Sequence, residues 1–143
     1  MRRFRALLFS FGTLLLVGSG ACRPSSEANG VVGSFGRMGL GPGDFTYPRA
    51  IAIAPDGRVF VVDKSGRVQR FSPDGEYETG WTMPRTAEGV PVGLSVHPDG
   101  RLFVPDTHNH RVQVFDRDGA LLSEFGRAGS GPGEFSLPTD VAF

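Results

Sequence analysis

The chain has 143 residues, which limits it to one modest domain, and its 21 glycines and 11 prolines favour an all-β protein rich in tight turns over a helical one. Three of its 15 basic residues stand at the extreme N-terminus, so the part from Cys22 onward carries a net charge of about −3. That part lacks the positive field that phosphate groups require, and we therefore expect no nucleic-acid partner.

Residues 1–22 have the features of an export signal. Three arginines precede residues 6–17, a run that is almost wholly apolar, and small residues follow it. A basic start, a short apolar run and a small-residue end are typical of a secretory signal, and the run is shorter than the roughly 20 residues that a membrane-spanning helix needs. We therefore predict export, with residues 23–30 as a short polar tether behind the signal.

Cys22, the only cysteine, directly follows Gly20 and Ala21. This order resembles the lipobox of bacterial lipoproteins, in which that cysteine becomes the lipidated N-terminus of the mature protein. Ser19 departs from the Leu usually found three residues before the cysteine. The resemblance implies a lipid-anchored protein facing the periplasm or the exterior. A plain secreted protein with a free thiol, a liability in an oxidising compartment, and an uncleaved anchor are the alternatives.

Residues 31–143 repeat themselves. Residues 48–63 align with residues 91–106 at an offset of 43, and Arg-Val-Gln-Arg-Phe at 67–71 returns as Arg-Val-Gln-Val-Phe at 111–115. A third match has an offset of 90 residues. Phe-Gly-Arg-Met-Gly-Leu-Gly-Pro-Gly-Asp-Phe at 35–45 returns as Phe-Gly-Arg-Ala-Gly-Ser-Gly-Pro-Gly-Glu-Phe at 125–135. A period of this length indicates a repeat architecture.

Each repeat has the pattern of a four-stranded antiparallel meander. Ile51 and Ile53 alternate with small residues, and residues 59–62 form an apolar run of strand length. Pro-Asp-Gly at 55–57 and its counterparts supply the residues that tight turns favour. We expect strands over residues 48–54, 58–63, 67–72, 76–81, 91–97, 101–106, 111–116 and 120–125. Four short strands per repeat form the blade of a β-propeller.

The sequence Asp-Thr-His-Asn-His-Arg-Val-Gln-Val-Phe at 106–115, followed by Asp-Gly, resembles the NHL repeat, as does Gly-Pro-Gly-Glu-Phe at 131–135. The resemblance covers residues 31–143 and implies an NHL-type β-propeller. The first repeat departs from the pattern at residues 64–66, which replace the Asn-His pair. Residues 82–90 depart from it too, because they lack the Gly-Pro-Gly-acid-Phe signature. These departures shift the expected blade boundaries by a few residues.

The number of repeats indicates an incomplete ring. The chain holds about two and a half blades, whereas propellers close with about four to eight and NHL proteins typically with six. Residues 30–36 align with the outer strand at 120–126, so an outer strand stands alone at the start of the repeats. We expect that this strand belongs to the last blade of a longer six-bladed protein, of which the chain is a part.

Few residues have the pattern of a chemical site. His97, His108 and His110 are the only histidines, and the last two are the nearest approach to a pair of metal ligands. They lie within the motif of the repeat, where such residues stabilise the turn between strands, so we predict neither a metal ligand nor a catalytic residue. Asp63 and Asp106 each end a second strand, and we expect them to cap the turn that follows.

We predict a non-catalytic binding or scaffold propeller of the bacterial cell envelope, without a cofactor, that presents its loops to a protein, peptide or glycan partner. The resemblance also allows a metal-dependent propeller enzyme, similar to the zinc-containing peptidyl-α-hydroxyglycine amidating lyase or to calcium-dependent lactonases, with a site that other blades complete. The fold alone does not decide between these functions. A third class, animal NHL proteins with ubiquitin-ligase domains or bound RNA, is disfavoured because no RING-type cysteines precede the repeats.

Overall fold

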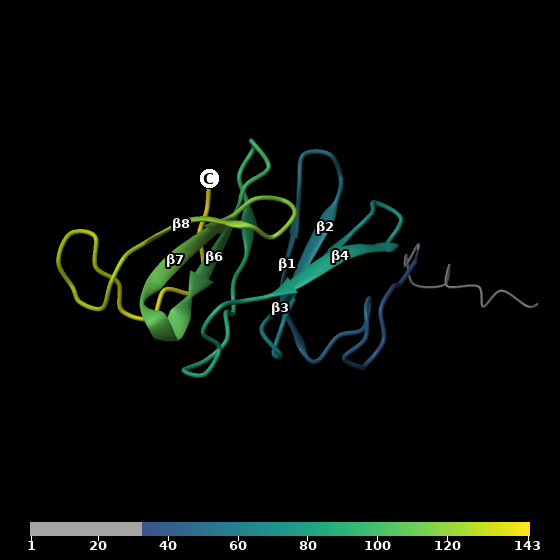
Figure 1. Ribbon diagram of the computed structural model, residues 1–143. Helices are drawn as coiled ribbons and strands as arrows, with labels where there is room; N and C mark the ends of the chain where they lie inside the picture. Colours follow the sequence, from purple (N-terminus) through teal and green to yellow (C-terminus); the bar gives the residue numbers. More distant parts are fainter. Residues whose placement is uncertain (1–32) are drawn as a thin grey trace, which may run out of the picture. The chain divides into compact units, whose positions relative to one another are not determined.

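A computed structural model describes residues 33–143, which form two four-stranded antiparallel sheets (Figure 1). Blade 1 consists of β1 (Pro48–Ile53), β2 (Val59–Asp63), β3 (Arg67–Phe71) and β4 (Tyr77–Thr82). Blade 2 consists of β5 (Ser95–Val96), β6 (Leu102–Asp106), the 3-10 turn η2 (Thr107–Asn109), β7 (Arg111–Phe115) and β8 (Leu121–Phe125). In both sheets the spatial order of the strands follows the chain, so the predicted all-β meander is confirmed.

The predicted export signal and the predicted lipid attachment at Cys22 lie outside the described residues. Within residues 33–143 no helix is long and apolar enough to span a membrane.

Four Asp-Gly turns close the β1–β2, β3–β4, β5–β6 and β7–β8 hairpins in the same way. The glycine N–H of each turn donates to the carbonyl three residues earlier, over 2.8–3.2 Å. The four pairs are Gly57 with Ala54, Gly75 with Ser72, Gly100 with His97 and Gly119 with Asp116. Each of these glycines has a positive φ, between 83° and 93°, which other residues rarely adopt. The predicted turn chemistry is therefore confirmed.

The inner strand of blade 2 is shorter than expected. We predicted a strand over residues 91–97, but only Ser95–Val96 pairs with β6. Pro91 has no N–H to donate to the ladder. Gly93 lies so close to residues 138–143 that a Cβ added there would collide with the carbonyl oxygen of Thr139. The inner end of blade 2 therefore packs on the following segment instead of extending its own sheet.

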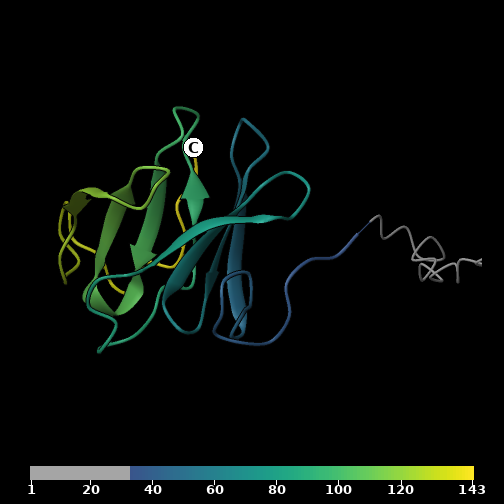
Figure 2. The ribbon, with the colours of Figure 1, turned by 45° about the vertical axis from the view of Figure 1, so that its right-hand side comes forward.

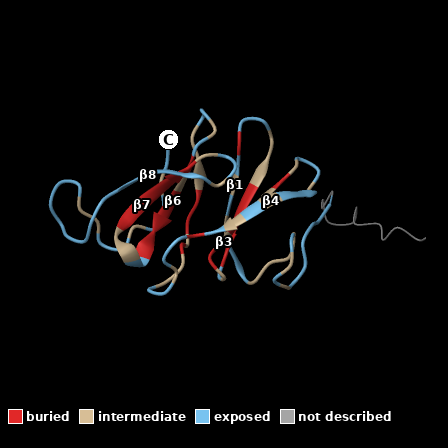
Figure 3. Ribbon diagram, viewed as in Figure 1, coloured by how far each residue is buried: buried red, intermediate tan, exposed pale blue. Residues whose placement is uncertain are grey.

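The core lies between the two sheets, which are seen side by side in Figure 2. Because side chains alternate across a strand, one face of blade 1 presents Ala52, Phe60 and Val62 together. The opposing face of blade 2 presents Leu102 and Val104, both fully buried. In Figure 3 the buried residues accordingly concentrate in β2, β6 and β7, whereas β4 and β8 are largely exposed. The interface between blades is thus the hydrophobic core of the molecule.

The opposite face of blade 1 is exposed. Ile51 and Ile53 project from it with 61% and 68% of their surface accessible, whereas Leu94, the residue of blade 2 that aligns with Ile51, is 5% accessible. The contrast arises because Leu94 packs against another blade and Ile51 does not. The equivalent face is therefore covered in blade 2, by blade 1, and uncovered in blade 1 within residues 33–143.

Two of three aromatic residues that align in the sequence pack on the blade that follows them. The Trp81 ring in β4 lies 5.9 Å from the Phe115 ring of blade 2, measured between centroids. Phe35, which aligns with Trp81, lies 4.9 Å from Phe71 of blade 1 in the same way. Phe125 is the third member of this series, and it remains 47% exposed. These aromatic residues mark successive blade-to-blade contacts.

Candidate functional site

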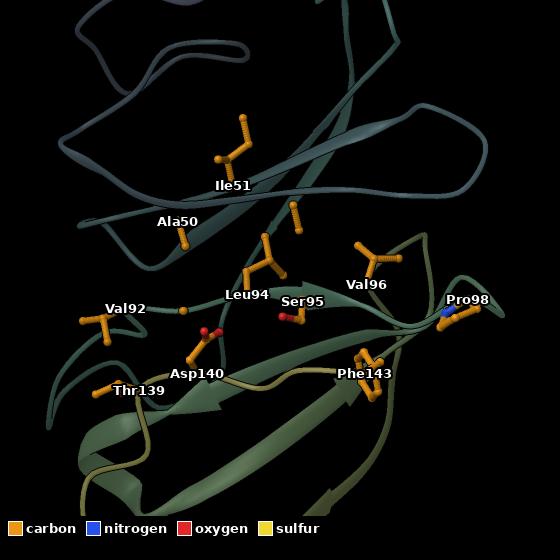
Figure 4. Close-up of a pocket in the computed structure, with 12 residues that line it drawn as sticks. Ala50, Ile51, Val92, Leu94, Ser95, Val96, Pro98, Thr139, Asp140 and Phe143 are labelled. Carbon is orange, nitrogen blue, oxygen red and sulfur yellow. The ribbon is translucent and has the colours of Figure 1, made fainter.

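A groove with a volume of about 650 Å³ runs along the inner segments of the two blades (Figure 4). Its walls come from β1, from residues 92–96 and from residues 139–143. The inner strands of a propeller surround its central channel. The groove is therefore the part of the channel wall that residues 33–143 supply, and in Figure 4 Ala50 and Ile51 face Leu94 and Asp140 across it.

Small residues shape the wall of the groove. Ala50 and Ala52 line it from β1, and Gly93 and Ser95 line it from blade 2. A wall of small side chains lets a bound molecule approach the protein backbone closely. An extended ligand would thus reach the main chain of β1, whose inner edge pairs with no strand within residues 33–143.

Asp140 is the one charged residue that lines the groove. One of its carboxylate oxygens accepts the N–H of Val141 at 2.9 Å, and no other hydrogen bond holds this carboxylate within the described part of the chain. Ile51 and Phe143 add exposed apolar surface to the same groove. The groove therefore combines apolar contacts with a single anionic group, a combination that suits a ligand with a basic group on an apolar body.

A second polar cluster lies at the turn between β2 and β3. Asp63 is 1% exposed and accepts hydrogen bonds from the Ser65 N–H at 2.9 Å and from the Ser65 hydroxyl, so it caps the turn as predicted. It also accepts the N–H of Thr46 at 3.0 Å and pairs with the Arg67 guanidinium at 2.7 Å. Asp63 therefore joins the turn to the segment that precedes β1.

The Asp63 carboxylate is stabilised in its charged form. Burial alone would raise the pKa of this carboxyl, but the hydrogen bonds from Ser65, Thr46 and Arg67 outweigh burial and hold the pKa below its ordinary value. A buried carboxylate with this many donors fixes the backbone around it. Asp63 is thus a structural anchor in blade 1.

Arg67 and Gln69 hold the first linker, residues 35–47, against blade 1. Arg67 donates to several backbone carbonyls of the linker, among them Leu40 at 2.7 Å. Gln69 accepts the N–H of Gly43 at 2.9 Å and donates to the carbonyl of Asp44 at 2.7 Å. The recurrence of Arg-x-Gln in both repeats is the signal in the sequence that could have indicated this role, but the sequence analysis predicted no role for these residues.

The corresponding turn of blade 2 is built differently. Asp106 makes no capping bond of its own to the η2 backbone, contrary to our expectation. It accepts instead from the Asn109 side chain and from Arg111, both at 2.9 Å. Arg111 also pairs with Glu124 at 2.7 Å. A side chain thus replaces the backbone cap because η2 inserts an extra residue into the turn.

His108 and His110 belong to the same turn but contact different segments. His110 ends η2 in a left-handed conformation, with φ 54°, and its Nδ1 accepts the N–H of Leu137 at 3.2 Å. His108 lies directly against Gly89, where an added Cβ would collide with the imidazole. Within residues 33–143 no three His, Cys, Asp or Glu side chains form a group able to hold a metal ion. His108 and His110 therefore belong to no such group among the described residues.

His97 lies at the far end of blade 2 from these two histidines. Its ring packs edge-on against Phe143, 4.7 Å between centroids, and beside Phe103. Its Nδ1 lies 2.8 Å from Asp99. His97 thus has packing partners in the structure.

Comparison with known proteins identifies an NHL repeat over residues 89–115. The protein named Protein brain tumor of Drosophila melanogaster is 36% identical over 52 residues, which are 36% of this chain and 5% of that protein. NHL repeat-containing protein 3 of Homo sapiens is 29% identical over 99 residues, which are 62% of this chain and 28% of that protein. The chain thus spans less than a third of either relative.

Among solved structures, virginiamycin B lyase from Staphylococcus aureus superposes with a TM-score of 0.54 at 21% identity, over 69% of this chain and 32% of the lyase. Likeness at this identity shows the fold alone. The chain therefore has a β-propeller fold built of four-stranded blades, as the repeats predicted, and it contains an NHL repeat.

Proposed function

We propose that the protein is a non-catalytic binding propeller whose partner is a peptide or protein segment with a basic group, held in the groove along the inner strands. The observation that carries the proposal is the edge of β1 at Ala50 and Ala52, which pairs with no strand within residues 33–143 and lines the groove that also holds the carboxylate of Asp140. Extended peptides bind by such backbone contacts and gain specificity from a few side chains.

The test is a screen of immobilised peptides against the purified protein, followed by calorimetry on the best binder. We expect peptides with Lys or Arg to be enriched, and Asp140→Asn to weaken binding about ten-fold, the effect of losing one charge-assisted contact. Val92→Phe, at a groove position outside the core cluster, narrows the groove and should weaken binding. Asp74→Asn removes a carboxylate in an outer turn and should leave binding unchanged.

Equal binding by the Asp140→Asn and Asp74→Asn proteins would contradict the proposed site. If glycans were enriched over all peptides on a mixed array, the ligand would be a glycan and the proposed peptide partner would be wrong.

We propose further that the protein acts in the bacterial cell envelope, anchored by a lipid on Cys22. The support is the order of charge, apolar run and small residues in residues 1–22. Cells labelled with radioactive palmitate should yield labelled protein, and Cys22→Ala should remove the label. Ser19→Leu, which restores the usual lipobox residue, should increase processing. Label that persists in Cys22→Ala would exclude this attachment site.

A further inference from the structure

The four tight turns of the hairpins each contain an Asp-Gly pair, at residues 56–57, 74–75, 99–100 and 118–119. All four aspartates are exposed, and in each turn the glycine N–H donates to the carbonyl three residues earlier. An Asp-Gly pair is prone to close into a cyclic imide, because glycine has no side chain to obstruct the aspartate carboxyl. Since the backbones of the turns are equivalent, their susceptibility depends on what each aspartate side chain contacts.

An arginine directly after the glycine holds the aspartate in two of the turns. Asp56 pairs with Arg58 at 2.8 Å, and Asp99 pairs with Arg101 at 2.7 Å. Hydrogen bonds from the backbone N–H and the guanidinium of Arg58 lower the pKa of Asp56. The same two groups of Arg101, the guanidinium foremost, lower the pKa of Asp99. Both carboxyl groups are therefore stabilised in the charged form.

The other two aspartates have no arginine after the glycine. Asp118 is held from the neighbouring blade instead, because Arg70 pairs with it at 2.8 Å. The turn that contains Asp74 has Glu76 in the position of the arginine, and a carboxylate has no proton to donate. Within residues 33–143 no group donates a hydrogen bond to the Asp74 carboxylate, and Asp74 itself donates its N–H to the Ser72 hydroxyl at 3.3 Å. Asp74 is thus the one aspartate of the four described turns that no arginine holds.

We propose that Asp74 is a site of spontaneous isomerisation, at which the peptide bond to Gly75 moves from the α-carboxyl to the β-carboxyl group. The Gly75 nitrogen attacks Cγ of the protonated Asp74 side chain and forms a C–N bond. The hydroxyl of the carboxyl group leaves with the proton of that nitrogen, as water. Water then adds to the α-carbonyl carbon of the five-membered imide and breaks its bond to the nitrogen. One water is released and one is consumed, so the reaction needs no other reactant.

The arginines oppose this reaction in the other three turns. The carboxyl group must be protonated before its oxygen can leave as water, and its Cγ must come within reach of the glycine nitrogen. A guanidinium that binds the carboxylate favours the charged form and restrains the side chain in the geometry of the pair. Because these pairs lie at the surface, we expect each to slow the reaction by a modest factor, about five-fold.

Phe35 connects this turn to the first linker. Its ring lies so close to Gly75 that a Cβ added there would stand 2.9 Å from it, and it packs on Phe71 at 4.9 Å between centroids. Isomerisation lengthens the backbone of the turn by one carbon atom and so displaces Gly75. The first linker should therefore lose part of its contact with blade 1 in the isomerised chain.

The experiment keeps the full purified chain at neutral pH and physiological temperature for several weeks and digests samples with trypsin. Cleavage after arginine places the four turns in four different peptides, residues 50–58, 71–85, 86–101 and 118–127. The isomer of a peptide has the parent mass but elutes separately, and an isoaspartyl methyltransferase transfers a methyl group to it. We expect the isomer of 71–85 to accumulate about five-fold faster than the isomers of the other three peptides.

Three variants separate the effect of the arginine from other features of the turns. Glu76→Arg supplies the missing arginine and should slow the reaction at Asp74. Arg101→Ala removes the partner of Asp99 and should raise the rate there to that of Asp74. Asp74→Glu should give no isomer, because the longer side chain would have to close a six-membered ring. Asparagine is unsuitable as a block at this position, because an Asn-Gly pair forms the same imide.

Unfolding in urea removes the ion pairs, so the four Asp-Gly pairs should then react at closely similar rates. Equal rates in the native chain, or an unchanged rate at Asp74 in the Glu76→Arg protein, would overturn the proposal. Hydrogen exchange at residues 36–45 should be faster in the isomerised chain than in the fresh chain. Unchanged exchange would overturn the inferred effect on the first linker.

Discussion

Blade 1 and blade 2 carry the same three polar residues around the turn between their second and third strands, but different parts of the chain satisfy them. In blade 1 the first linker saturates Arg67 and Gln69 with backbone groups. In blade 2 the Nη2 of Arg111 and the Oε1 of Gln113 are buried without a hydrogen-bond partner among the described residues.

The difference follows from the linkers and not from the blades. Residues 35–47 carry the Gly-Pro-Gly sequence that folds into a ring of carbonyls, whereas residues 82–90, which precede blade 2, lack it. Glu124 substitutes in part, by an ion pair with Arg111. The Arg-x-Gln pair therefore binds a linker, and it contributes little to the stability of the sheet that carries it.

The largest effect should come from a matched pair of core substitutions. Phe60 and Phe103 align, but Phe60 is 1% exposed between the blades, whereas Phe103 is half-buried beneath Phe143. Phe60→Ala should lower the free energy of unfolding by about 3–5 kcal/mol, and Phe103→Ala by less than half as much, because the second leaves a smaller cavity. Urea unfolding followed by circular dichroism measures both. Equal losses would mean that the outer face of blade 2 is as well packed as the core.

A smaller effect should separate the two glutamines. Gln69→Leu leaves the Gly43 N–H and the Asp44 carbonyl unsatisfied, which costs about 1–3 kcal/mol. Gln113→Leu removes an amide whose oxygen has no partner among the described residues and whose nitrogen makes one long bond, to Glu124 at 3.3 Å, so it should cost less than about 1 kcal/mol. The two variants have the same change in chemistry and volume, so thermal unfolding isolates the contribution of the linker. A Gln113→Leu protein that is as unstable as Gln69→Leu would contradict the comparison.

The repeats made most of the fold predictable. The offset of 43 residues and the Asp-Gly turns placed eight strands, and seven of them agree with the structure to within about one residue at each end. The exception is β5, where Pro91 and Gly93 interrupt the ladder. Their effect depends on residues 138–143, which contact them only in the folded chain. Tertiary contact therefore overrode the local pattern at this strand.

The polar clusters were less predictable. The capping role of Asp63 followed from its place at the end of a strand, but the role of Arg67 did not, because its carbonyl partners lie more than twenty residues earlier in the chain. Backbone carbonyls have no signature in a sequence, since every residue carries one. The groove that Asp140 lines could not be predicted for a similar reason, because its wall is assembled from three segments that are separate in the sequence.

Acid should weaken blade 1 through Asp63. The carboxyl has a pKa below its ordinary value of 3.8 in the folded chain, so its stabilising effect is complete above pH 3.8 and is lost as the pH falls through the lower, folded value. Asp63→Asn should be less stable than the native chain at neutral pH. Below pH 3.8 it should lose less further stability than the native chain, by about 1.4 kcal/mol for each unit by which the pKa is lowered. Urea midpoints between neutral and acidic pH test this, and parallel curves for the two proteins would exclude Asp63 as the source of acid sensitivity.

The smallest effect should distinguish the first linker from the equivalent linker at residues 125–137, the third linker, which is closed by the same kind of parallel bridge. Arg37 and Arg127 are 84% and 76% exposed and form equivalent ion pairs, so Arg37→Ala and Arg127→Ala should each change global stability by less than about 0.5 kcal/mol. Local opening should differ, because Arg67 still holds the first linker when Arg37 is lost, whereas the third linker depends on its own bonds. Hydrogen exchange should therefore accelerate more at residues 129–131 in Arg127→Ala than at residues 39–41 in Arg37→Ala. Equal acceleration would show that the arginine of the blade adds nothing to the order of its linker.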